Sequence, residues 1–230
     1  FSDIIKLEEE FLINNIEMNG NIFKNSSLKE NVFLLFISIV TNIPLTIIGQ
    51  SGKSLSIELI IKSMKGKYSK TNFFKKFPAV IPTYFQNSEY INNEDIKNVF
   101  QIAEGKYKFY SDKKCINKNE SLLSLIIFDN IGIKHELNYE TKNVNYIRIS
   151  NDINDIFNYS ELNKGLTLLV QNIDDKYDDA IDTCKHIADN IKKDLSKNEI
   201  FDIIPRTYIT YMNTLKLIQD LEVCKKLNIS

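Results

Sequence analysis

The chain has 230 residues, of which 43% are hydrophobic, and its formal net charge is −1 with an isoelectric point near 6.2. This length fits one large domain or a large domain with a smaller one, and the balanced charge argues against a broad nucleic-acid-binding surface. Three widely spaced cysteines form neither a disulfide framework nor a zinc pattern, and no apolar run reaches membrane-spanning length, so we expect a cytoplasmic protein without a membrane span.

Strands and helices are predicted to alternate along most of the chain. In chain order, the apolar spacing predicts a helix over 28–41, a strand over 44–48, a helix over 54–64, a strand over 79–85, a helix over 93–103, and strands over 122–128, 144–149 and 166–170. Ser26 and Ser27 are candidate N-caps of the first helix, and residues 1–27 are treated as a lead-in. This alternation is typical of an α/β fold with a mostly parallel sheet flanked by helices.

The end of the chain is predicted to be a small helical subdomain. No strand pattern follows residue 175, whereas 180–195 and 207–227 carry apolar residues at helical spacing. We therefore expect an α/β subdomain over 1–175 and a helical lid subdomain over 176–230. Because the chain begins with Phe1, we also expect it to be part of a longer polypeptide.

A glycine-containing loop joins the first predicted strand to a helix, which is the context of a phosphate-binding loop (P-loop). It runs Gly49-Gln50-Ser51-Gly52-Lys53-Ser54 and is called the 49–54 loop below. Its backbone N–H groups, with those of the helix as far as Leu55, would face phosphate; Lys53 would reach the terminal phosphates of ATP, and Ser54 would bind Mg²⁺. Two residues separate the glycines where the usual spacing has four, and the alternative is a plain turn before a helix.

The most apolar predicted strand ends at Asp129, where the second Mg²⁺ ligand of P-loop enzymes belongs. The alternative for an aspartate at a strand end is a simple loop cap. The next residue is Asn130, and an amide cannot accept the proton of an attacking water. The pair therefore predicts ATP binding without efficient hydrolysis, unless another carboxylate such as Glu136 supplies the base.

Three further polar residues occupy positions from which they could contact a nucleotide. Asn151 ends the next strand and could contact the γ-phosphate or the attacking water, and its alternative role is that of an ordinary turn residue. Lys164 precedes the last strand and could point at a neighbouring unit's nucleotide, or face solvent. Arg206 begins a helix of the expected lid, where its guanidinium could reach phosphates or pair with Asp202 at the surface.

Several short sequence stretches along the chain are more specific than the phosphate-binding loop alone. They are Leu-Lys-Glu-Asn-Val-Phe at 28–33, Ile-Pro-Leu at 43–45, Lys-Ser-Leu-Ser at 53–56, Met-Lys-Gly at 64–66, Phe-Phe-Lys-Lys-Phe-Pro at 73–78, Asp-Asn-Ile-Gly at 129–132, Ile-Ser-Asn at 149–151, Leu-Asn-Lys-Gly at 162–165 and Ile-Pro-Arg-Thr-Tyr at 204–208. Together they resemble the AAA+ units of the mysterin family, whose members are giant dynein-like AAA+ E3 ubiquitin ligases. The resemblance covers roughly residues 28–217.

The resemblance implies a role for each residue that matches the family's motifs. Lys53 and Ser54 fall in the ATP-binding loop, Asp129 at the Mg²⁺ carboxylate, Asn151 at the first sensor and Arg206 at the second. It also implies a P-loop AAA+ sheet followed by the helical lid, with ATP and Mg²⁺ as cofactors.

Three departures from the family pattern qualify the expected function. The 49–54 loop is two residues short, Asn130 replaces the family's catalytic glutamate, and Lys164 replaces an arginine finger whose planar fork suits a transferring phosphoryl group. We therefore expect an ATP-binding module with weak hydrolysis and a structural or regulatory role beside neighbouring AAA+ units of a mysterin-like ligase. The alternatives are an active ATPase that uses another base, and an interaction scaffold that binds no nucleotide. Nothing in the chain resembles a RING or ubiquitin-transfer zinc module.

Overall fold

The computed structural model describes residues 2–18, 22–49, 52–86, 92–112, 121–129, 143–151 and 165–170, all within the first of the two units into which the chain divides, Phe1–Gln171. In chain order the elements are α1 (Ser2–Asn15), α2 (Ser26–Thr41), β1 (Leu45–Ile48), α3 (Lys53–Ser63), the short 3-10 turns η1 (Gly66–Tyr68) and η2 (Phe74–Lys76), β2 (Ala79–Gln86), α4 (Asn93–Asp112), β3 (Leu122–Asp129), β4 (Val144–Ser150) and β5 (Leu166–Leu169). Every predicted strand and helix in this part of the chain is present, although α4 extends well beyond the expected end at residue 103.

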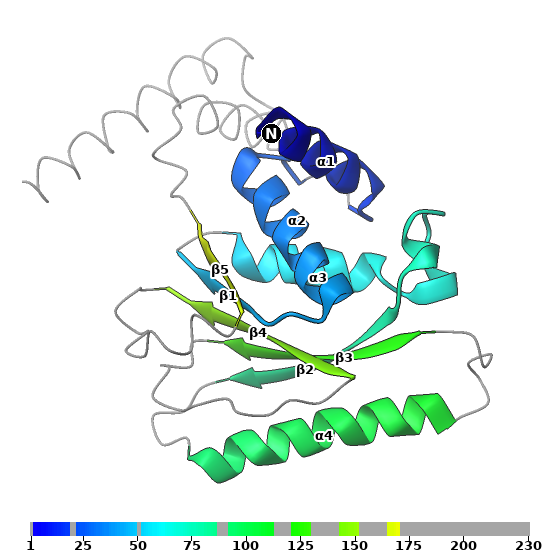
Figure 1. Ribbon diagram of the computed structural model, residues 1–230, viewed down its shortest axis with the longest axis vertical. Helices are drawn as coiled ribbons and strands as arrows, with labels where there is room; N and C mark the ends of the chain where they lie inside the picture. The colour runs from blue at the N-terminus through cyan, green and yellow to red at the C-terminus, as the bar shows by residue number, and fades with distance from the viewer. Residues whose placement is uncertain are drawn as a thin grey trace, which may run out of the picture. The chain divides into compact units, whose positions relative to one another are not determined.

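The five strands form one parallel sheet in the order β2-β3-β4-β1-β5 (Figure 1). The insertion of β4 between β1 and β3 is seen in the register, where Ile48 is level with Ser150 and Asp129 is level with Ile149. Because the strands are parallel, their carboxyl ends lie at one edge, and ligands of such sheets bind beyond that edge. The 49–54 loop therefore begins at the same edge at which β3 and β4 end.

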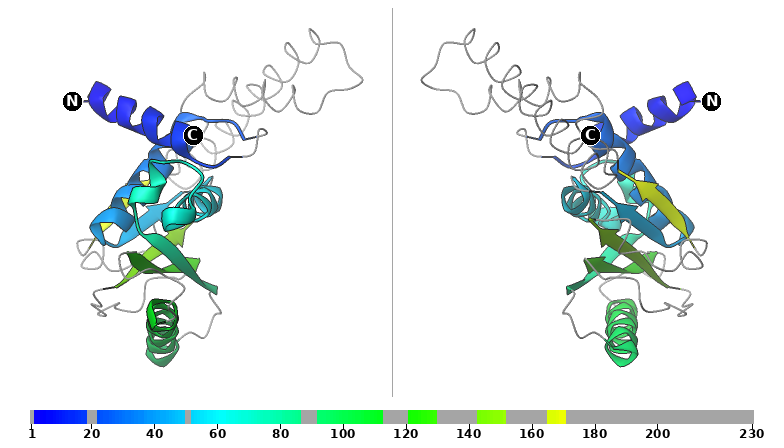
Figure 2. Two further views of the ribbon diagram at one scale, coloured as in Figure 1. Left: turned by 90° about the vertical axis from the view of Figure 1, so that its right-hand side faces the viewer. Right: turned by 90° about the vertical axis from the view of Figure 1, so that its left-hand side faces the viewer.

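Helices cover both faces of the sheet (Figures 1 and 2). Helices α2 and α3 pack on one face, with α1 against α2, while α4 covers β2, β3 and β4 from the other. Along β3, Leu125 and Ile127 belong to the core beneath α2 and α3, whereas Ile126 and Phe128 belong to the core beneath α4. Successive residues of a strand alternate between faces, so Asp129 lies on the α3 face.

The N-cap of α2 is Asn25, so the expectation of Ser26 or Ser27 was wrong. The Oδ1 of Asn25 accepts a hydrogen bond from the backbone N–H of Leu28 at 2.8 Å, and Ser26 is already the first helical residue. Asn and Ser are about equally good caps, so residue type alone does not decide between three consecutive candidates. The backbone conformation identifies Asn25 as the N-cap, because the backbone is extended there with ψ at 168°.

The lead-in expected over 1–27 contains a helix, α1, that the sequence analysis did not predict. Leu12 and Ile13 of this helix are buried in the same core as α2 and α3, and the ring of Phe11 packs edge-on against Phe73 with 5.3 Å between centroids. After the helix, the Glu17 carboxylate pairs with Lys70 at 2.7 Å, and this bond lowers the pKa of Glu17. The lead-in is therefore part of the packed α/β unit.

The helical lid expected over 176–230 lies outside the described residues. In the ranges that are described, no helix is long and apolar enough to cross a membrane.

Candidate functional site

The 49–54 loop leaves the sheet at Gly49, where the backbone is enclosed by two neighbouring strands. The N–H of Gly49 donates to the carbonyl of Ser150 at 3.0 Å, and the N–H of Val170 donates to the carbonyl of Ile48 at 2.7 Å. A Cβ atom at Gly49 would lie 2.7 Å from the Cβ of Val170 and 2.8 Å from its carbonyl oxygen, and the φ of 144° is a conformation that side chains rarely adopt. The first residue of the loop is therefore fixed, and it must be glycine.

The second glycine of the loop begins helix α3. Gly52 has a left-handed φ of 77° and serves as the N-cap without any side-chain hydrogen bond. The first N–H groups of an α-helix have no intrahelical acceptor, and the helix dipole places partial positive charge beside them. Here those groups belong to Lys53, Ser54 and Leu55. This end of α3 therefore offers several donors to an anion such as phosphate.

Lys53 is the first residue of α3, and its side chain is buried with an exposed fraction of 5%. Its Nζ donates hydrogen bonds to the carbonyl of Gly49 and, at 2.9 Å, to the Oδ1 of Asn151. Burial lowers the pKa of Lys53 because the ammonium loses hydration, and the negative charge of Asp129 opposes this with a smaller effect. A desolvated cation next to a helix N-terminus would be stabilised by an anionic ligand.

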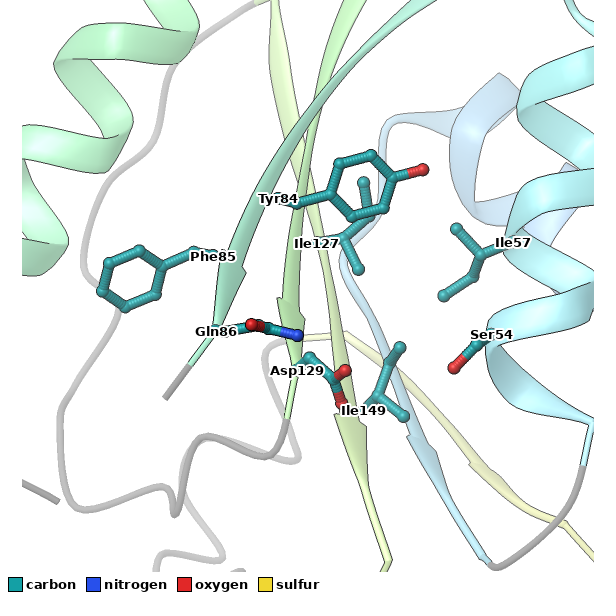
Figure 3. Close-up of a pocket in the computed structure, with 8 residues that line it drawn as sticks. All are labelled: Ser54, Ile57, Tyr84, Phe85, Gln86, Ile127, Asp129 and Ile149. Atoms are coloured by element: carbon teal, nitrogen blue, oxygen red, sulfur yellow. The ribbon is translucent and has the colours of Figure 1, made fainter. Parts of the chain in front are cut away.

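A cavity of about 330 Å³ opens beside the loop, between α3 and the carboxyl ends of β2, β3 and β4 (Figure 3). The Ser54 hydroxyl and the Asp129 carboxylate point toward each other across it, one from each side. The remaining lining residues are Ile57, Tyr84, Phe85, Gln86, Ile127 and Ile149. The space next to the loop is therefore open, and its two short oxygen-bearing side chains face each other.

Ser54 and Asp129 carry oxygen atoms of the kind that could bind a magnesium ion. Mg²⁺ prefers oxygen ligands, and it commonly binds through one or two protein groups together with the phosphates of a substrate. Among the described residues, no group of three or more His, Cys, Asp or Glu side chains is placed to hold a metal ion. A divalent cation between Ser54 and Asp129 would therefore take its further ligands from water or from phosphate oxygens.

Asn151 follows β4 directly and links the loop to the end of that strand. Its side chain is exposed, and by the alternation along β4 it lies on the same face as Ile149, toward α3. Its Oδ1 accepts the hydrogen bond from Lys53. Because β4 separates β1 from β3, Asn151 occupies the position between the lysine of the loop and the carboxylate of β3.

The structure brings together most of the site residues that the sequence predicted. Those at the carboxyl edge of the sheet are Gly49, Gly52, Lys53, Ser54, Leu55, Asp129 and Asn151. Leu55 contributes its backbone, since its side chain is 38% exposed. The other predicted residues, which are Gln50, Ser51, Asn130, Lys164 and Arg206, lie outside the described part of the chain.

One residue beside the loop was missed by the sequence analysis as a candidate site residue. Asn31 of α2 is only 1% exposed, and a Cβ atom at Gly52 would lie 3.5 Å from its Nδ2. Asn31 lies in a mostly apolar buried stripe with Leu28, Val32 and Leu35, in which Ser38 is the other polar residue. A buried amide within such a stripe is rare enough to serve as a sequence signal.

Tyr84 of β2 was also missed, and it forms part of the cavity wall (Figure 3). Burial raises the pKa of its hydroxyl, and the nearby negative charge of Glu58 raises it further. No sequence signal distinguishes Tyr84 from other aromatic residues of strands, because its role depends on which strand ends next to α3.

Comparison with known proteins identifies the family of this sheet and loop. A family model of the RNF213 AAA domain matches residues 21–148, which is more than half of the chain. The chain belongs to the RNF213 AAA domain family. The matched segment of the chain includes the 49–54 loop and Asp129, whereas Asn151 follows its end. The expected resemblance to mysterin-type AAA+ units and the α/β fold with a parallel sheet flanked by helices are both confirmed.

Individual relatives agree with the family match. The chain is 33% identical over 130 residues to the E3 ubiquitin-protein ligase rnf213-beta of Danio rerio. It is 25% identical over 136 residues to the E3 ubiquitin-protein ligase RNF213 of Homo sapiens, and 26% identical over 130 residues to that of Mus musculus. These alignments cover between 56% and 58% of the chain but only 2% of each relative, so the chain spans a small part of their length.

Proposed function

We propose that this domain binds ATP together with Mg²⁺ at the N-terminus of α3. The observation that carries the proposal is the convergence of three groups at one edge of the sheet. Lys53 is buried beside the helix N-terminus, while Ser54 and Asp129 face each other across the adjoining cavity. The phosphates of ATP would give the Lys53 ammonium a negatively charged partner. They would also give a cation held by Ser54 and Asp129 further oxygen ligands.

The same proposal includes slow hydrolysis of the bound ATP. Asn130 directly follows Asp129, at the position where the family's motif has glutamate, and an amide cannot serve as a general base. Lys164 stands where the family has an arginine finger, and its ammonium is a poorer match for a transferring phosphoryl group. Bound ATP would then act by keeping the domain in one conformation.

For the parent protein, we propose a cytoplasmic E3 ubiquitin ligase of the RNF213 type in which this domain is one member of a ring of AAA+ units. The relatives are named E3 ubiquitin-protein ligases, and the chain corresponds to a small part of them. Neighbouring AAA+ units of the same parent are the proposed partners, and the domain's role is structural or regulatory. Ubiquitin transfer would belong to another part of the parent, since no RING-like cysteine pattern is present in this chain.

One observation favours a second function, that of an interaction scaffold without nucleotide. The ammonium of Lys53 already donates to the Gly49 carbonyl and to Asn151, and the loop is two residues shorter than the usual spacing. If those bonds are stronger than the bonds that Lys53 would form with phosphate, the domain would bind partner proteins through its surface and would bind no nucleotide in the cavity.

A titration with a fluorescent ATP analogue in the presence of Mg²⁺ separates the two functions. The proposed function predicts saturable binding in the micromolar range, and a loss of at least tenfold in affinity for Lys53→Ala. Lys62→Ala is a matched control, because it removes a lysine from the last turn of the same helix that does not line the cavity. Absence of binding in the unaltered chain would reject the proposed function and support the scaffold.

A further inference from the structure

Helix α2 places one buried amide directly against the 49–54 loop. Asn31 has an exposed fraction of 1%, and its neighbours on the same helix face, Leu28, Val32 and Leu35, are apolar and equally buried. A Cβ atom at Gly52, the N-cap of α3, would lie 3.5 Å from the Nδ2 of Asn31. The amide nitrogen therefore lies next to the N-cap of the predicted phosphate-binding helix, in the space that a side chain at Gly52 would enter.

Within the described part of the chain, the Nδ2 of Asn31 has no hydrogen-bond partner and no exposure to solvent. A buried N–H that makes no hydrogen bond costs free energy, and buried amides are retained where a partner is present in some state of the protein. Ser38 on the same helix illustrates the ordinary case: its hydroxyl donates to the carbonyl of Ile43 at 2.6 Å, and the Nδ2 of Asn145 lies 3.3 Å away. The donor of Asn31 is thus unusual for its helix.

The hydrogen bonds of Lys53 suggest why a donor that is unpaired among the described residues, the Nδ2 of Asn31, is located beside the 49–54 loop. In the present state, Lys53 donates to the carbonyl of Gly49 and to Asn151. If its ammonium turns to a bound phosphate, the carbonyl of Gly49 loses this donor. Asn31 lies against the loop at Gly52 and has a donor to offer.

We propose that Asn31 is a positioning residue of the loop: its Nδ2 donates to the loop backbone near Gly52 when a triphosphate is bound, and it thereby stabilises the binding conformation. This inference rests on the proposed function, because it requires that the loop accept a nucleotide. The amide acts through the loop and not on the ligand, since Asn31 is buried and is not among the residues that line the cavity.

The test combines affinity with stability, because a purely structural amide and a positioning amide differ in these two readouts. Asn31→Leu keeps the size of the side chain and removes the donor. Among the described residues the Nδ2 of Asn31 donates no hydrogen bond that this change would remove, so the melting temperature of the free chain is expected to stay the same or to rise. Affinity for the fluorescent ATP analogue with Mg²⁺ is expected to fall about five- to tenfold, the range that a single hydrogen bond supplies.

Two further variants sharpen the result. Asn31→Asp has the same shape but presents only acceptors and a negative charge near the phosphates, so its affinity is expected to fall at least as far; it also replaces Asn31→Leu if that variant does not fold. Ser38→Ala, which removes a buried hydrogen bond elsewhere on α2, is expected to lower the melting temperature and leave affinity unchanged.

The outcomes separate the positioning role of Asn31 from the proposed binding of ATP. If the unaltered chain binds the analogue and Asn31→Leu binds it equally well, the positioning role is rejected and the proposed function stands. The positioning role is also rejected if Asn31→Asp retains full affinity, because the loop would then need an acceptor and not a donor. If the unaltered chain binds no nucleotide, the proposed function and this inference both fail.

Discussion

The Nζ of Lys53 donates a 2.9 Å hydrogen bond to the Oδ1 of Asn151, which joins the first turn of α3 to the residue that follows β4. The two residues are 98 positions apart in the sequence, and the parallel sheet brings them together because β4 is the neighbour of β1. The bond uses the same ammonium that would contact a phosphate. Asn151 and a nucleotide are therefore expected to compete for Lys53.

Asn151→Asp tests this competition. The new carboxylate would form an ion pair with Lys53 and hold the ammonium away from phosphate, while adding a negative charge beside the triphosphate. At an exposed position such a pair contributes about 0.2–1 kcal/mol, so the free chain should be slightly more stable. Affinity for ATP with Mg²⁺, measured by calorimetry, should fall about tenfold, which corresponds to about 1.4 kcal/mol. Because both effects are electrostatic, both should weaken at high salt, and salt-independent effects would contradict the explanation.

Lys53→Met tests the cost of burying the ammonium in the free domain. The pKa of Lys53 is lowered from its ordinary 10.5, so between the lowered value and 10.5 the unfolded chain binds more protons than the folded chain. The stability of the unaltered chain must therefore rise with pH in that window, relative to a variant that cannot titrate at this position. Below the lowered pKa both states are protonated, and the difference between the two proteins should be constant.

Urea unfolding of the unaltered chain and of Lys53→Met, repeated from pH 7 to pH 10.5, measures this linkage. The difference in the free energy of unfolding, unaltered minus variant, should become more positive as pH approaches 10.5. Other lysines and Tyr84 titrate in both proteins, so their contributions cancel in the difference. A difference that stays flat or falls with pH would show that burial does not depress the pKa of Lys53.

Asp129→Asn tests whether the carboxylate acts through Mg²⁺. In the unaltered chain, removal of Mg²⁺ with a chelator should weaken ATP binding, because Asp129 and Ser54 would then face the phosphates without the cation between them. In Asp129→Asn the affinities with and without Mg²⁺ should converge to within about threefold, since an amide is a weaker ligand than a carboxylate. Glu58→Gln also removes one negative charge, from α3 instead of β3, and should leave the dependence of ATP affinity on Mg²⁺ intact. Equal dependence in all three proteins would exclude Asp129 as a ligand.

Much of the fold could be predicted from the sequence because its strands are buried on both faces and read as apolar runs. β3 is the clearest case, since residues 123–128 are all buried, and its end at Asp129 was placed within one residue. The caps were harder to predict. Ser26 and Ser27 were predicted in place of Asn25 because both residue types, Asn and Ser, cap helices, and only the extended backbone at Asn25 distinguishes the three positions.

The site was predictable where one local motif contains it, and less so where tertiary packing creates it. The residues from Gly49 to Ser54 stand together between a strand and a helix, so their proximity follows from the sequence. That Lys53 meets Asn151 depends on the strand order, which the apolar pattern does not contain. The contact of Asn31 with Gly52 depends on how α2 packs against α3, and it was missed for that reason.

A pair of glycine substitutions tests how rigidly the start of the loop is fixed. At Gly49 a methyl group would lie 2.7 Å from the Cβ of Val170, in a backbone conformation that side chains rarely adopt, so Gly49→Ala should destabilise the chain by about 2–4 kcal/mol. Gly105 is inside α4 with nothing within 4 Å of its Cβ position, so Gly105→Ala should stabilise the chain by about 0.5–1 kcal/mol. Urea unfolding measures both, and a neutral Gly49→Ala would mean that β5 yields at its carboxyl end.

Asn130→Glu tests whether hydrolysis is slow because a general base is missing. The glutamate would restore the family's motif directly after Asp129, and general-base catalysis contributes about 10²–10⁴-fold to rate in enzymes that possess it. Lys164 would still replace the arginine finger, so we expect the lower part of that range, with at least a tenfold increase in phosphate release and ATP affinity within about twofold of the unaltered chain. Asn130→Gln is the matched control, because it has the length of glutamate but cannot accept a proton. If glutamine raises the rate as much as glutamate does, the gain comes from packing and not from proton transfer; if neither raises it, hydrolysis is limited by another part of the site, such as the shortened 49–54 loop or the lysine at the finger position.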